Sequence, residues 1–226
     1  PRPTAVLSGS AAYCQNQPAS TNLSIAFTGT GPWTYTLNGS DASSVTATTS
    51  SNPVTVTVNP NSATPALITY TVSALSDANC AAIGADITGS GTVTINPLAA
   101  APTANVTQPT CAVATGSITM TAPLGAGNSY TLDGTTTITW PSITFSGVAP
   151  GPHTITVTNS FGCSAPASAS VTVNPQPFTP SAPTVSGPTN VCPFLGNSTQ
   201  VTYTANTPGA SGYTWILPPN VNLISG

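Results

Sequence analysis

The sequence predicts an all-β protein made of tandem β-sandwich modules. Charged residues make up 2% of the 226 positions, against roughly 25% in an ordinary globular protein. The chain relies instead on Thr, Ser, Asn, Val, Gly and Pro, which disfavour helix interiors and suit strands and turns. Similar segments also recur along the chain, as expected of a repeat architecture. Low charge does not indicate disorder here, because 39% of the residues are hydrophobic.

The predicted strands are runs in which Thr or Ser alternates with an apolar residue. The clearest runs are 33–37, 54–58, 69–72, 117–121 and 154–158. Alternation with a period of two places aliphatic side chains on one face of a sheet and hydroxyls on the other. Two sheets of this kind bury their dry faces by stacking, which makes a sandwich.

The first part of the chain contains about seven predicted strands, with the spacing of an immunoglobulin-like fold. They lie near 5–9, 21–29, 33–38, 43–49, 53–58, 67–75 and 91–96. The order of these strands in the sheets does not follow from the sequence.

Repeated openings and endings divide the chain into modules 1–97, 98–175 and 176–226. The first two modules close on similar strands at 92–97 and 170–175, and the third opens at 183–187 much as the first does at 5–9. The third module is therefore expected to be the N-terminal part of an incomplete sandwich. The joints between modules are short and rich in Pro or Ala, which favours extended, semi-rigid linkers.

The five cysteines are predicted to form disulfides. They are Cys14, Cys80, Cys111, Cys163 and Cys192. We expect the pairs Cys14–Cys80 and Cys111–Cys163, each closing a loop worth about 4 kcal/mol in the chain-entropy model, and a partner for Cys192 beyond the chain end. Disulfides indicate an oxidising, extracellular compartment. Zinc sites use close pairs such as C-x2-C, and this spacing is absent from the sequence.

Titratable residues are too few to favour an enzyme. The chain has no Glu or Lys, four Asp and one His, whereas acid–base chemistry needs titratable groups placed against each other. His153 opens a strand, and no nucleophile-elbow motif accompanies it. The scattered Asp residues make a calcium site a weak alternative, confined to a module joint. We expect no catalytic residue, no metal and no cofactor.

Nucleic acid and membranes are also excluded as partners. A net charge of −3 gives no field that attracts nucleic acid, and no apolar run reaches about 18 residues, the length needed for membrane insertion. Trp33 and Trp215 lie in alternating runs and are expected to be core anchors, whereas Trp140 is the candidate for stacking on a sugar. The Thr rows lack the constant short period that an ice-binding surface needs.

Several segments resemble a known repeat. The segments of the second module resemble the SprB-type repeats of gliding-motility adhesins in Bacteroidota. They are PTC at 109–111, GSITMT at 116–121, YTLDG at 130–134, and the segment 145–163, which ends in Gly-Cys. The first module (GTGPWTY at 29–35, SDANC at 76–80) and the third (SGPTNVC at 186–192, GYTW at 212–215) resemble the PKD-like, immunoglobulin-like modules of the same proteins.

This resemblance implies a structural or adhesive segment of a large secreted protein on the bacterial cell surface. Such a segment acts as a stiff repeat spacer or filament building block in adhesion or gliding, and the type IX secretion machinery is its partner during export. Neighbouring repeats, identical chains and surface polysaccharide are the other expected partners. The alternative hypothesis is a carbohydrate-binding accessory module of a secreted multidomain hydrolase.

Overall fold

The computed structural model describes residues 1–226 apart from 166–169, 179–180, 195, 197, 218–221 and 225–226. The described residues contain strands and 3₁₀ turns but no α-helix, so the predicted all-β class is confirmed. The chain forms two compact units. One unit comprises residues 1–106, 118–145 and 152–172, and the other comprises 107–117, 146–151 and 173–226.

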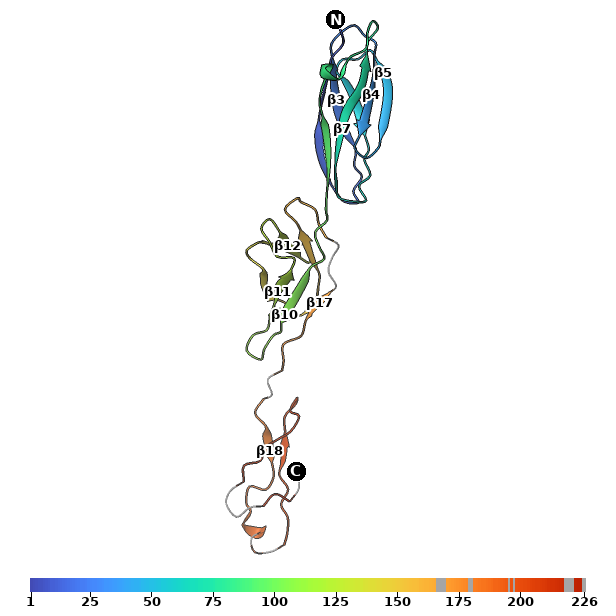
Figure 1. Cartoon of the computed structure of the whole chain (residues 1–226). Helices are drawn as coiled ribbons and strands as arrows, with labels where there is room; N and C mark the ends of the chain where they lie inside the picture. Colours follow the sequence, from blue (N-terminus) through green and yellow to red (C-terminus); the bar gives the residue numbers. More distant parts are fainter. Residues whose placement is uncertain (166–169, 179–180, 195, 197, 218–221, 225–226) are drawn as a thin grey trace. The chain divides into compact units, whose positions relative to one another are not determined.

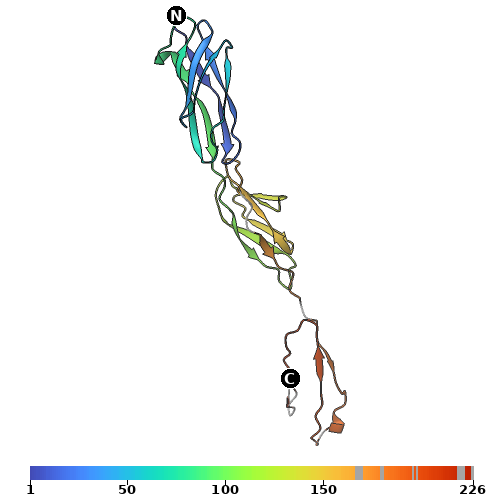
Figure 2. The ribbon, with the colours of Figure 1, turned by 90° about the vertical axis from the view of Figure 1, so that its right-hand side faces the viewer.

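Residues 1–97 form a β-sandwich of two sheets. One sheet has the order β6 (Val54–Val58), β3 (Thr21–Phe27), β1 (Ala5–Ser8) and β8 (Ile87–Gly89). The other has the order β2 (Ser10–Cys14), β9 (Gly91–Asn96), β7 (Ala66–Ser76), β4 (Trp33–Gly39) and β5 (Ser44–Thr49). The strands run along a common direction in both views (Figures 1 and 2). Every strand predicted for this part is present, and β2 and β8 are additional.

The chain crosses from one sheet to the other at Gly9. Before it, β1 pairs antiparallel with β3; after it, β2 pairs parallel with β9. Gly9 has φ +127°, and a Cβ there would lie 2.9 Å from a methyl carbon of Leu23, so both the backbone and the core favour glycine. The parallel pairing brings Cys14 opposite Asn96, at the end of the sandwich where its last strand finishes.

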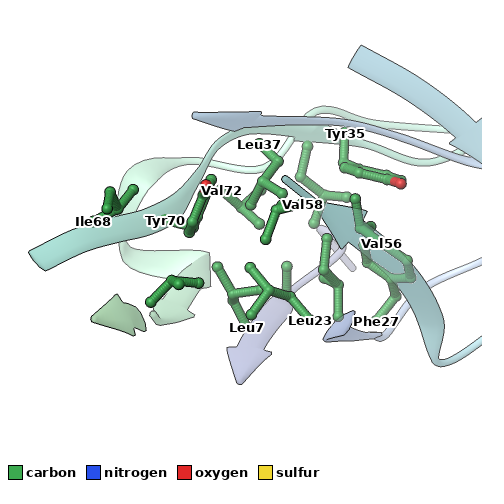
Figure 3. Packing of buried hydrophobic residues seen from close by; sticks show 14 of the residues in the cluster. Leu7, Leu23, Phe27, Tyr35, Leu37, Val56, Val58, Ile68, Tyr70 and Val72 are labelled. Carbon is green, nitrogen blue, oxygen red and sulfur yellow. The ribbon is translucent and has the colours of Figure 1, made fainter. Parts of the chain in front are cut away.

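The apolar positions of the alternating runs form the core between the sheets. Its largest members are Leu7, Leu23, Ile25, Phe27, Trp33, Tyr35, Leu37, Ile68, Tyr70, Leu75 and Ile95. Side chains from β1, β3 and β6 face those from β4 and β7 (Figure 3). Trp33 stacks on Phe27 with ring centroids 5.3 Å apart, and its indole N–H donates to the Thr28 carbonyl. Trp33 is therefore the core anchor that the alternation predicted.

The described residues of 98–175 contribute three further sheets. Their strand orders are β10 (Thr103–Thr107), β11 (Gly116–Ala122), β14 (Thr144–Val148); β13 (Thr136–Thr139), β12 (Ser129–Leu132), β16 (Ile155–Thr158); and β15 (Gly151–His153), β17 (Val171–Val173). The alternating residues of β11 and β16 point their apolar side chains inward, because Ile118, Ile155 and Val157 are all fully buried.

Residues 176–226 carry less regular structure among the positions described. Strand β18 (Thr184–Ser186) pairs antiparallel with β19 (Thr204–Asn206). Trp215, expected to be a core anchor within a strand, is half-buried and lies outside any strand. The alternating run around it therefore does not form the strand that the sequence predicted.

We expect Leu23→Ala to lower the free energy of unfolding by about 2–5 kcal/mol, because truncation of a buried Leu loses transfer energy and leaves a cavity. Leu23 is 0% exposed, whereas Val6 in the neighbouring strand is 50% exposed. The matched control Val6→Ala should change it by no more than about 0.5 kcal/mol. Urea unfolding followed by far-UV circular dichroism measures both, and equal losses would contradict the assignment of the core.

Candidate functional site

One disulfide joins residues that lie far apart in the sequence. Cys14 is bonded to Cys163, with a Cα–Cα distance of 5.5 Å and a sequence separation of 149. Cys80, Cys111 and Cys192 are free and exposed. The predicted pairs Cys14–Cys80 and Cys111–Cys163 are therefore wrong. We call the observed bond the staple, because it links residues of the first and second predicted modules.

Strand direction explains why Cys14 does not bond to Cys80. The thiol of Cys80 lies 3.8 Å from the Pro1 carbonyl, beside the start of β1. From there β1 and β2 run to Cys14, and ten residues of strand cover on the order of 30 Å. A disulfide requires Cα atoms within about 7 Å. The two cysteines thus belong to opposite ends of the sandwich.

Asn159 builds the loop that presents Cys163. Its side-chain oxygen accepts hydrogen bonds from the backbone N–H groups of Phe161 and Cys163, both at 3.0 Å. Its amide nitrogen donates to the Pro97 carbonyl at 2.9 Å. The loop is therefore fastened to the last residue of the first predicted module as well as to itself. Cys163 is 0% exposed.

Asp77 builds a similar loop around Cys80. One carboxylate oxygen accepts from the N–H groups of Asn79 and Cys80, both at 2.8 Å, and the other accepts from Thr30 at 3.1 Å. These backbone hydrogen bonds lower the pKa of Asp77 below its ordinary value, because they favour the charged form of the carboxylate. The hydrogen bond from Asn79 has the largest effect. The sequence indicated a turn at Asp77, and its hydrogen bonds to Asn79 and Cys80 confirm it. Asn159 was not predicted, although its spacing from Cys163 offered a similar signal.

His153 is paired with Asp133. The His153 Nδ1 lies 2.7 Å from one Asp133 oxygen, and the Thr154 N–H donates to the other at 2.8 Å. The hydrogen bond from His153 is the main reason that the pKa of Asp133 is lowered. Asp133 and Gly134 have φ values of 49° and 67° and form the turn between β12 and β13. The pair thus anchors a hairpin turn, which accounts for both residues without catalysis.

Hydroxyl pairs cover the outer faces of the sheets. Cross-strand partners hydrogen bond at 2.7–3.0 Å: Thr34 with Thr48, Thr36 with Thr46, Thr103 with Thr121, Thr119 with Thr144, and Thr131 with Thr137. Cross-strand Thr pairs stabilise sheets by roughly 0.2–1 kcal/mol each. Because neither partner is charged, this contribution depends little on pH or salt.

Trp140, the candidate for ligand stacking, follows β13 and is 38% exposed. Its backbone N–H donates to the Asn128 carbonyl at 3.0 Å, which fixes the main chain at this point. The residue is thus partly exposed, and its role in sugar binding stays a prediction.

A shallow depression lies over β4–β7 and is lined by Asp41, Ser43, Val45 and Tyr70, among others. Asp41 accepts hydrogen bonds from both the N–H and the hydroxyl of Ser43. The carboxylate is thus engaged in the turn that precedes β5.

Side chains that could ligate a metal are dispersed over the described positions. Within these positions, no three His, Cys, Asp or Glu side chains come together as metal ligands would. No helix in the same set of positions is long and apolar enough to cross a membrane.

Comparisons with known proteins identify no family for this chain. No family model matches the sequence, and no curated protein matches it. Among solved structures, the chain is similar to a biofilm-associated protein BSP domain, with 18% sequence identity and a TM-score of 0.24. That match covers 77% of this chain and 29% of the other, so the chain spans less than a third of that structure's length.

We expect the isolated single chain, purified as an unreduced monomer and unfolded in denaturant, to react with three equivalents of a thiol reagent, because Cys14 and Cys163 are bonded and three cysteines are free. Cys14→Ser should react with one more, since it releases Cys163, and the control Cys80→Ser with one fewer. A single reactive thiol in the parent chain would mean two disulfides in place of one, and five reactive thiols would mean that the staple is absent; either count contradicts the assignment.

Asp133 should make the free energy of unfolding depend on pH in the acidic range. The pKa of Asp133 is lower in the folded protein than in the unfolded chain. Its contribution to the free energy of unfolding is therefore fully present above the ordinary Asp pKa of about 3.9, and it is lost as the pH falls through the pKa of the folded protein. The difference in unfolding free energy between the parent chain and Asp133→Asn should therefore shrink on acidification. Urea unfolding at neutral pH and below the ordinary value measures this, and a constant difference would contradict it.

Proposed function

We propose that this chain is a load-bearing spacer of an adhesive protein on a bacterial cell surface. The observation that carries the proposal is the staple between Cys14 and Cys163, which closes a span of 149 positions. In the chain-entropy model a loop of this length is worth about 5 kcal/mol against the unfolded state. Such a crosslink also limits how far the chain can extend under tension, because the residues between the two cysteines cannot lengthen while the bond is intact.

The hydroxyl surface supports the same role. With one Arg, no Lys and four Asp in the chain, the sheets are held by Thr pairs in place of ion pairs. Surface ion pairs weaken as salt rises, and carboxylates lose their charge in acid. Neutral faces keep their hydrogen bonds in both conditions, which suits a protein outside the cell, where conditions vary.

The finer assignment rests on the resemblance to SprB-type and PKD-like repeats. On that basis we propose export by the type IX machinery and a place in adhesion or gliding. Neighbouring repeats, identical chains and surface polysaccharide are the proposed partners. Charged residues and Pro usually protect sheet edges from association, and the scarcity of charge at this surface favours contact with similar modules.

A carbohydrate-binding accessory module is the second candidate, because Trp140 is an aromatic residue that is 38% exposed. The coding sequence on either side of this segment distinguishes the spacer from the accessory module. Further repeats favour the spacer, and a catalytic domain favours the accessory module.

Stretching the chain from its two ends tests the load-bearing role. The staple prevents the segment between Cys14 and Cys163 from extending, so reduction should add about 50 nm of contour length at ~3.6 Å for each of the 149 positions released. Force spectroscopy in the presence and absence of a reductant measures this gain.

Cys80→Ser is the matched control, because it removes an exposed thiol outside the staple. This variant should show the same contour length as the parent chain both with and without reductant. The Cys14→Ser variant should reach its full contour length without reductant. Full extension of the unreduced parent chain would contradict the proposal.

A further inference from the structure

The cysteines fall into two kinds of position that alternate along the chain. The first kind, which we call exit-end cysteines, lies beside the Asn-Pro at which a module's last strand finishes. The second kind, which we call entrance-loop cysteines, lies in an Asx-anchored loop. In order, Cys14 is exit-end, Cys80 entrance-loop, Cys111 exit-end and Cys163 entrance-loop.

Contacts of the backbone define the exit-end kind. Cys14 is opposite Asn96 in the sheet, and the N–H of the next residue, Gln15, donates to the Asn96 carbonyl at 2.8 Å. The Cys111 carbonyl accepts from the Gln176 side chain at 2.9 Å, two residues after Asn174. Both cysteines thus accompany an Asn-Pro, 96–97 in one case and 174–175 in the other.

Contacts to a proline carbonyl that precedes the first strand of the module define the entrance-loop kind: Pro1 precedes β1, and Pro97 precedes β10. The Cys80 thiol lies 3.8 Å from the Pro1 carbonyl, and Asn159, which anchors the Cys163 loop, donates to the Pro97 carbonyl. In both loops one Asx oxygen accepts the N–H of the cysteine itself. Each loop is also closed by a short antiparallel bridge, Ser76 with Ala81 and Thr158 with Ser164.

The staple shows what the two kinds do when they meet. It joins an exit-end cysteine, Cys14, to an entrance-loop cysteine, Cys163. Cys163 is fully buried in that bond, whereas Cys80, in the matching loop, is exposed and unbonded. Cys111 is likewise exposed and unbonded, although it too lies beside an Asn-Pro.

We propose that Cys80 and Cys111 are unpaired halves of the same staple. Cys80 bonds to an exit-end cysteine of another module of this type, and Cys111 bonds to an entrance-loop cysteine of another. Cys192 follows a segment like the one that leads to Cys14, so it acts as a further exit-end cysteine. This inference concerns covalent partners, goes beyond the load-bearing role and stands without it.

The chemistry is a thiol–disulfide exchange. The two thiols lose two protons and two electrons and form one S–S bond, while a disulfide oxidant, either oxidised glutathione or an oxidoreductase disulfide, is reduced to two thiols. The partner module lies either in the same polypeptide or in a second copy of the chain. Both sources offer the same group, a cysteine of the complementary kind.

Covalent linkage between copies tests the pairing rule. The full unreduced chain is incubated at high concentration in a glutathione redox buffer, alkylated, digested with pepsin at low pH and mapped by mass spectrometry. We expect multimers in which Cys80 is joined to Cys111 or Cys192 at least tenfold more often than to another Cys80. Absence of multimers, or links between like cysteines at equal frequency, would overturn the proposal.

Cys80→Ser is the matched variant, because it removes the entrance-loop thiol and keeps both exit-end thiols. The yield of multimers should fall at least tenfold in this variant, and persistence of the parent level would overturn the rule.

Disulfide mapping of the protein from its native source, alkylated during extraction, then identifies the partner. A Cys80 peptide joined to an exit-end cysteine supports the rule, and the migration of the unreduced protein in a denaturing gel shows whether the bond lies within one polypeptide or between copies. A Cys80 peptide recovered as the alkylated free thiol overturns it.

Discussion

The strict alternation of hydroxyl and apolar residues is the constraint from which the rest of the structure follows. It gives each sheet of the first sandwich one face that must leave water and one face that water can solvate. Leu7 and Leu23 are buried, whereas the polar residues beside them, such as Ser8 and Asn22, point the other way. The outward hydroxyls then replace charge as the source of solubility. They also bond to each other across strands, so a surface almost without ions is still held together.

The crossing at Gly9 converts this sandwich into a unit that can be linked to a neighbour. If the first strand continued in one sheet, Cys14 would follow β3 and would not meet the last strand. The switch to β9 instead places Cys14 beside Asn96, where the chain leaves the sandwich. A glycine with positive φ, packed against Leu23, is therefore a local requirement of the disulfide as well as of the core.

The sequence allowed the strands of the first sandwich and the burial of Trp33 to be predicted, because both follow from local periodicity. It did not reveal β2 and β8, since the Ala-rich stretch before Cys14 and the three residues of β8 are too short or too uniform to show alternation. The disulfide pairing failed for another reason. It depends on which end of a sandwich each cysteine occupies, and that follows from strand direction and sheet order. The similar Asx-anchored loops of Cys80 and Cys163 indicate that these two cysteines hold equivalent positions, but they do not tell a partner in the same module from a partner in the next one.

The long loop closed by Cys14 and Cys163 also changes what a single break in the backbone does. Most peptide bonds of the first two predicted modules lie inside this loop. Hydrolysis of any one of them leaves both fragments attached through sulfur, so the protein is not severed. Proteases in the surroundings would have to cut outside the loop, or cut and reduce, before anything held at the far end was released.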